Sequence, residues 1–172
     1  MASSALSGAS ADDEKAVRDF QAHVTSYLEL RKEAGTAPRS TNSADKVAET
    51  QEALASKMKA LRPNATQGEI FTPAVTAYFR RRIVLLLAGA EGAKIRASLR
   101  HAEPVHGVAL RVNEEYPEGV PVQSTPPTLL SALPILPDSL EYRIVGRSLV
   151  LRDIAPNLVV DFIPNALPVV GE

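Results

Sequence analysis

The chain has 172 residues, no cysteine and a formal net charge of −1. The absence of cysteine excludes disulfide scaffolds, thiol catalysis, iron–sulfur clusters and thiolate zinc sites. Hydrophobic residues make up 45% of the chain and charged residues 23%, a globular composition that excludes disorder over most of its length.

Charge and proline content both change near residue 101. Residues 1–101 hold 15 Lys+Arg against 11 Asp+Glu, a net charge of +4, whereas residues 102–172 hold four Arg against nine Asp+Glu, a net charge of −5. Ten of the 13 prolines lie from Pro104 onward. This asymmetry predicts a basic helical part over 12–101 and an acidic sheet part over 102–172, and the small, polar residues 1–11 predict a flexible tail before them. We expect the two larger parts to attract each other.

Two helices are predicted first in the chain. Over 12–34, apolar residues spaced three and four apart form one stripe that ends at Arg31. Over 43–62, Ser43 is a natural N-cap, and a narrow stripe of the coiled-coil type follows. That stripe consists of Val47, Leu54, Met58 and Leu61. Because the linker over 36–42 is short, the two helices should form an antiparallel hairpin.

A third helix should start at Thr72-Pro73, where a capping hydroxyl precedes a proline, and could run to about Arg100. Its segment 83–87 is apolar on every side, which predicts burial on several sides. Gly89 and Gly92 are a weak point, so the helix kinks or breaks there, or another backbone packs closely against it. The longest apolar run, 83–90, is far shorter than the roughly 20 residues of a membrane span.

The second part of the chain predicts β-structure. Val108, Leu110 and Val112 alternate with other residues as in a half-buried strand, and a short helix is expected over 128–133. Three further strands over 140–145, 148–153 and 158–163, separated by turn residues, should form an antiparallel meander. The predicted fold class is therefore α+β, with a helical hairpin and a third long helix before a small antiparallel sheet.

Three groups of polar residues are candidates for chemistry. Arg82, Arg96 and Arg100 would share one face of a continuous third helix and could hold an anion or an acidic partner, or pair with acids of the second part. His101, Glu103 and His106 have the side chains of a metal site, or they are solvated residues at a helix end. Asp153 and Asp161, with Glu141, could serve as paired carboxylates, or they are edge and turn residues with arginine partners.

No sequence motif for a cofactor, a phosphate-binding loop or a nucleophile elbow is present, so no cofactor is expected and the sequence leans away from an enzyme. Few aromatic residues flank the arginines, so base stacking, and with it nucleic-acid binding, is not expected.

Residues 136–163, which include the runs Leu-Glu-Tyr-Arg and Leu-Val-Leu-Arg-Asp, resemble the C-terminal segment of uncharacterised exported bacterial proteins. They are also loosely similar to the terminal meander of a periplasmic nickel/cobalt-homeostasis family. The resemblance implies a periplasmic or extracellular location, with the cytoplasm as the alternative, and it carries no catalytic residue across.

The sequence favours a non-catalytic protein-binding or assembly module, such as an accessory subunit or envelope protein. Its helical seam and sheet edge would meet another protein or a second copy of the chain. The alternatives are a small hydrolase or transferase that uses Asp153 and Asp161, and a metal-handling protein.

Overall fold

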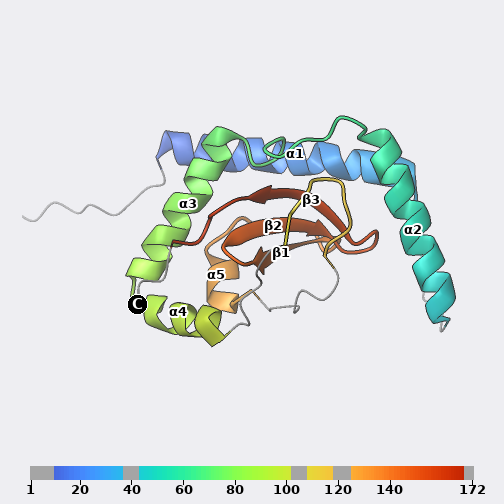
Figure 1. Ribbon diagram of the computed structural model, residues 1–172. Helices are drawn as coiled ribbons and strands as arrows, with labels where there is room; N and C mark the ends of the chain where they lie inside the picture. The colour runs from blue at the N-terminus through green and yellow to red at the C-terminus, as the bar shows by residue number, and fades with distance from the viewer. Residues whose placement is uncertain (1–9, 37–42, 102–107, 118–124, 169–172) are drawn as a thin grey trace, which may run out of the picture.

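The computed structural model describes residues 10–36, 43–101, 108–117 and 125–168. Five helices and three strands follow one another in these residues, and Figure 1 shows their arrangement. The helices are α1 (Ala11–Ala34), α2 (Ala44–Leu61), α3 (Pro73–Ala88), α4 (Gly92–His101) and α5 (Pro127–Ser131). The strands are β1 (Leu140–Val145), β2 (Ser148–Asp153) and β3 (Leu158–Ile163). The α+β class and the bounds of all three predicted meander strands are confirmed.

The sheet is an antiparallel meander in the order β1-β2-β3. Val145 pairs with Ser148 across a two-residue turn, in which Gly146 has a φ of 59°. A glycine at the first central position is what a type II′ hairpin turn requires. The pairing of β2 with β3 shifts between Leu151 and Arg152, so β3 carries one extra residue and forms a β-bulge.

One face of the sheet packs against the helices. A single hydrophobic cluster joins the buried stripe of α1, residues of α2, α3 and α4, and alternate residues of the strands. At its centre Phe79 of α3 makes edge contacts with Phe20, Phe71 and Tyr142, at ring-centroid distances of 5.1–5.9 Å. The basic helical part and the acidic sheet part therefore share one core.

The opposite face of the sheet is covered by residues 108–117. Tyr116 is buried there with Val145, Val150 and Val159, and Val108 packs against them. The strand predicted near Val108 is wrong: residues 108–112 are irregular, and only Glu115 forms an isolated bridge, with Leu158 of β3. The alternation indicated burial correctly, but no neighbouring strand offers residues 108–112 a ladder of hydrogen bonds among the described residues.

The predicted third helix breaks at its glycines. Helix α3 ends at Ala88 and α4 begins at Gly92, whose added Cβ would lie 1.9 Å from the carbonyl oxygen of Leu87. Only glycine permits this approach of the two helix ends. The expected burial on several sides of residues 83–87 is wrong, because Val84 and Leu85 are exposed while Ile83 and Leu87 enter the core.

Helices α1 and α2 do not lie side by side along their length, as the expected antiparallel hairpin requires. Helix α2 stands across the C-terminal end of α1 in Figure 1. Its buried residues, Leu54, Ala55 and Met58, belong to its second half, and Val47 in its first half is exposed. A narrow stripe supplies too little apolar surface to hold the whole of α2 against α1. None of the described helices is both long and apolar enough to cross a membrane.

Candidate functional site

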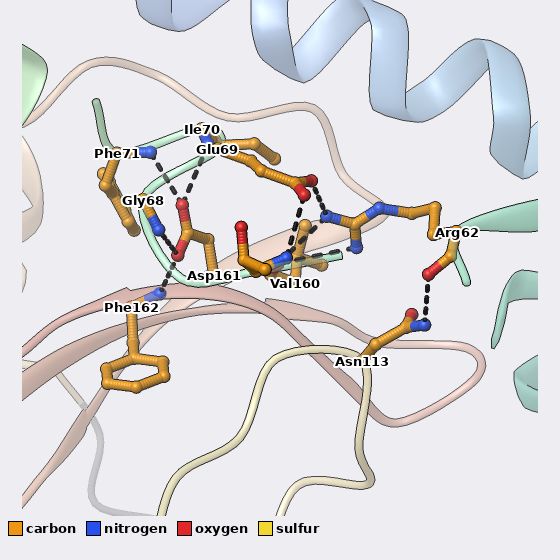
Figure 2. A network of polar contacts seen from close by, with 10 residues as sticks. Arg62, Gly68, Glu69, Ile70, Phe71, Asn113, Val160, Asp161 and Phe162 are labelled. Carbon is orange, nitrogen blue, oxygen red and sulfur yellow. Dashed lines mark hydrogen bonds and ion pairs between the residues drawn. The ribbon is translucent and has the colours of Figure 1, made fainter. Parts of the chain in front are cut away.

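Asp161 is fully buried and holds the connector between α2 and α3 against β3 (Figure 2). Its carboxylate accepts hydrogen bonds of 2.8–2.9 Å from the backbone N–H groups of Gly68, Ile70, Phe71 and Phe162. Strict alternation along β3 would have placed Asp161 on the face away from Val160. The β-bulge brings both residues to the helix side of the sheet, which allows Asp161 to reach the connector.

Arg62 completes this joint from the end of α2. Its buried guanidinium donates to the carbonyl of Val160 and, at 3.1 Å, to the carboxylate of Glu69 (Figure 2). It also lies 5.1 Å from the ring centroid of Tyr27, a cation–π distance. The amide of Asn113 donates to the backbone carbonyl of Arg62. The network therefore fixes the fold, since each of its side chains is bonded within the protein.

Asp153 forms a second buried joint, between β2 and α1. Its Oδ2 accepts hydrogen bonds of 2.8 Å from both the Tyr27 hydroxyl and the Arg31 guanidinium. Burial raises the pKa of Asp153, although the bond from Tyr27 and the charge of Arg31 act in the opposite direction. Burial also raises the pKa of Tyr27, and the nearby Asp153 carboxylate raises it further. The Tyr27 hydroxyl therefore keeps its proton and donates a hydrogen bond to Asp153.

The three candidate carboxylates do not form a catalytic group. Asp153 and Asp161 have no exposed surface, and both serve as acceptors inside the protein. Glu141 pairs with Arg152 on the outer face of the sheet, whereas Asp153 lies on the face toward α1. Since a general acid or base must reach a substrate proton, this arrangement removes the residues on which the hydrolase or transferase alternative depended.

The metal alternative concerns residues that are mostly outside the described part of the chain. Glu103 and His106 lie outside it, and His101 is the last residue of α4. Within the described ranges, no group of three or more His, Asp or Glu side chains could hold a metal ion. A metal site at His101, Glu103 and His106 stays a prediction.

The three candidate arginines do not lie together in the structure. Arg82 of α3 donates at 3.3 Å to the carbonyl of Ala132, just after α5. Arg96 and Arg100 of α4 instead line one small cavity together with Arg147. The break between α3 and α4 explains the difference, because the shared face assumed one continuous helix. Among the described residues, no acid pairs with Arg82, Arg96 or Arg100, so the alternative of pairing with acids of the second part finds no support there.

A cavity lies along β1, an edge strand of the sheet in the described part of the chain. It has a volume of about 440 Å³ and is lined by β1 residues 140–143, by Thr125 and by the chain around α5. Ile135 is 92% exposed at this cavity and Leu130 is 40% exposed. Apolar surface of this kind beside an open strand edge is typical of an interaction site rather than of a closed core.

Part of the outward backbone of β1 has no hydrogen-bond partner among the described residues. Because the Val145–Ser148 pair closes the hairpin, odd-numbered residues of β1 bond to β2, and Tyr142 and Ile144 turn their backbone groups outward. The Thr125 hydroxyl donates at 2.9 Å to the outward carbonyl of Tyr142. Within the described ranges, no backbone group from outside the sheet bonds to Ile144.

A charged network borders the same cavity on the outer face of the sheet. Glu141 accepts bonds from Arg143 at 2.7 Å and Arg152 at 2.5 Å. Burial acts to raise the pKa of Glu141, but the hydrogen bonds from these arginines outweigh it and hold that pKa below its ordinary value. The two arginines and one carboxylate leave an excess positive charge. The Nε of Arg143 is buried and has no hydrogen-bond partner among the described residues.

Sequence reasoning placed the sheet edge among the contact surfaces but missed the residues that shape the cavity: Thr125, Leu130, Ile135, Leu136 and Arg143. The available signal was the run Pro134-Ile135-Leu136-Pro137, in which two prolines hold apolar residues outside any regular element. Arg147, in the turn between β1 and β2, donates from its Nε to the carbonyl of Leu167 at 3.0 Å.

Comparisons with protein-family models, with curated proteins and with solved structures found no significant match to this chain.

Proposed function

We propose that the protein is a non-catalytic binding module that takes an extended segment of a partner protein along the edge of β1. One observation carries the proposal: the outer edge of β1, which pairs with no other strand among the described residues, lies beside an apolar cavity of about 440 Å³. Added strands gain affinity from backbone hydrogen bonds and specificity from pockets for alternate side chains. Here the outward backbone of Ile144 would supply the hydrogen bonds, and the cavity would supply the pocket for a side chain.

The side chains that line the cavity indicate which residues the partner segment should carry. An apolar side chain would bury the exposed surfaces of Ile135 and Leu130. A carboxylate would match the excess positive charge that Arg143 and Arg152 leave beside Glu141. The expected segment is therefore extended and carries an apolar residue close to an Asp or Glu.

Selection of displayed peptides against the full chain tests this proposal. We expect enrichment of segments that combine apolar and acidic residues. The dissociation constant of a selected peptide should rise about tenfold or more in Arg143→Gln, because a charge-assisted bond is lost. Ile135→Asp should weaken binding similarly. Ile154→Asp is the matched control, since Ile154 is also exposed but does not line the cavity.

Amide exchange supplies a second readout. Exchange at Ile144 should slow when the peptide is bound, because an added strand protects the outward amide. Binding that survives both Arg143→Gln and Ile135→Asp would contradict the proposal. A dimer of the chain that dissociates in Ile135→Asp would assign the groove to a second copy instead.

A further inference from the structure

A second, smaller cavity lies between the end of α3, helix α4, the β1–β2 turn and residues 167–168. Its volume is about 170 Å³, the space of roughly five or six water molecules. Three of its lining residues are arginines, Arg96, Arg100 and Arg147, and no carboxylate lines it among the described residues. Elements from both halves of the chain build this site.

Two of the guanidinium groups are positioned by backbone carbonyls. Arg96 Nη1 donates at 2.5 Å to Leu87, which caps the end of α3, and Arg147 Nε donates at 3.0 Å to Leu167. A guanidinium carries five N–H donors, so each of these arginines keeps further donors for a ligand. Arg100 is exposed and makes no hydrogen bond or ion pair within the described ranges.

Three cations around one small cavity repel one another unless an anion is present. In the described part of the chain, none of the three arginines forms an ion pair that would relieve this repulsion. Arginine forks also match the oxygen geometry of phosphate and carboxylate groups. The cavity therefore has the charge and the donors of an anion site.

We propose that this cavity binds the phosphoryl group of free phosphate or of a small phosphate monoester. A phosphoryl group carries a charge of about −1.5 to −2 and three strong acceptor oxygens, which suits three guanidiniums better than the single charge of a carboxylate. The volume accommodates such a group and little more, so the remainder of an ester would project out of the cavity. This site is separate from the β1 groove and does not depend on the function proposed there.

Calorimetric titration of the full chain with inorganic phosphate, at constant ionic strength set with chloride, tests the proposal. We expect saturable binding at one site. Arg100→Gln should weaken it about tenfold, because one charge-assisted contact is lost. This variant should fold normally, since Arg100 is exposed. Arg111→Gln is the control: Arg111 is also exposed and lies outside the cavity, so this variant should leave the affinity unchanged.

Further ligands identify the source of the phosphoryl group. Ethyl phosphate binding as tightly as inorganic phosphate would indicate a monoester ligand, and weaker binding would indicate free phosphate. Acetate binding as tightly as phosphate would overturn the assignment in favour of a carboxylate. The absence of phosphate binding, or equal weakening by Arg100→Gln and Arg111→Gln, would also overturn it.

Discussion

Single buried carboxylates hold the helices to the sheet in this protein. Asp161 anchors the α2–α3 connector, and Asp153 anchors α1. Both are buried in strands whose other residues are mostly apolar, and a buried charge is retained only where hydrogen bonds compensate for the lost water. The two carboxylates therefore position backbone and side chains. This role needs only hydrogen-bond acceptors inside the protein and no exposed surface.

Replacement of Asp161 should destabilise the protein strongly. Asp161→Ala leaves four backbone N–H groups without their acceptor. We expect the free energy of unfolding to fall by about 3 kcal/mol or more, measured by urea denaturation. Asp161→Asn should cost less, because its amide oxygen still accepts. Asp138→Ala, at an exposed aspartate, is the control and should change stability by no more than about 0.5 kcal/mol. Equal stability of the two alanine variants would contradict the anchoring role of Asp161.

At the scale of elements, the junction between α3 and α4 determines how the second cavity is built. The two helices turn at Gly89–Gly92, which brings Arg96 back to the carbonyl of Leu87. A continuous helix would have carried Arg96 away from the end of α3, at a rise of about 1.5 Å per residue. Close packing against Leu87 thus requires a glycine at position 92, whereas position 89 has room for a Cβ.

The two glycines should respond differently to alanine. In Gly92→Ala, the new methyl group meets the Leu87 backbone, and we expect a loss of about 1–3 kcal/mol in unfolding free energy as α4 is displaced. Gly89→Ala is the matched control, because its Cβ would lie 3.4 Å from the nearest atom and its φ of −78° suits any residue. Thermal unfolding of both variants measures the difference. A Gly89→Ala variant as unstable as Gly92→Ala would show that helix breaking, not packing, is the reason for both glycines.

At the scale of the whole molecule, opposite charges join the two parts at two ion pairs among the described residues. Arg31–Asp153 is the buried ion pair between them, and Lys59–Glu114 is an exposed one. Exposed pairs contribute little, typically below about 1 kcal/mol. The shared apolar core therefore contributes most to holding the two parts together.

The buried pair predicts a specific pH dependence. Because the folded state raises the pKa of Asp153, the folded protein binds this proton more tightly than the unfolded chain does. The contribution of Asp153 to stability is then greatest at low pH and declines as the pH rises through the folded-state pKa. Relative to Asp153→Asn, the wild type should gain stability as the pH falls from 7 towards 4, as urea denaturation at both values measures. A change in the opposite direction would mean that Arg31 outweighs burial.

The sequence by itself determined the local structure with the most regular pattern. Alternation bounded by turn residues located all three strands, and Ser43 and Thr72 marked the starts of α2 and α3. These features depend on neighbours within a few residues, such as a capping hydroxyl or a two-residue turn. For the same reason the α+β class followed from the order of the patterns.

Only the tertiary structure decided which residues meet. The β-bulge turned Asp161 inward, the approach of Gly92 to Leu87 broke the third helix, and the hairpin turn placed Arg147 beside α4. Each outcome depends on backbone contacts between different segments of the chain, which the hydrophobic pattern within one segment does not reveal. In a strand, a one-residue shift reverses the face of every side chain after it. The sequence therefore located a basic helical part and a sheet edge, and the fold turned them into an arginine cavity and an apolar groove.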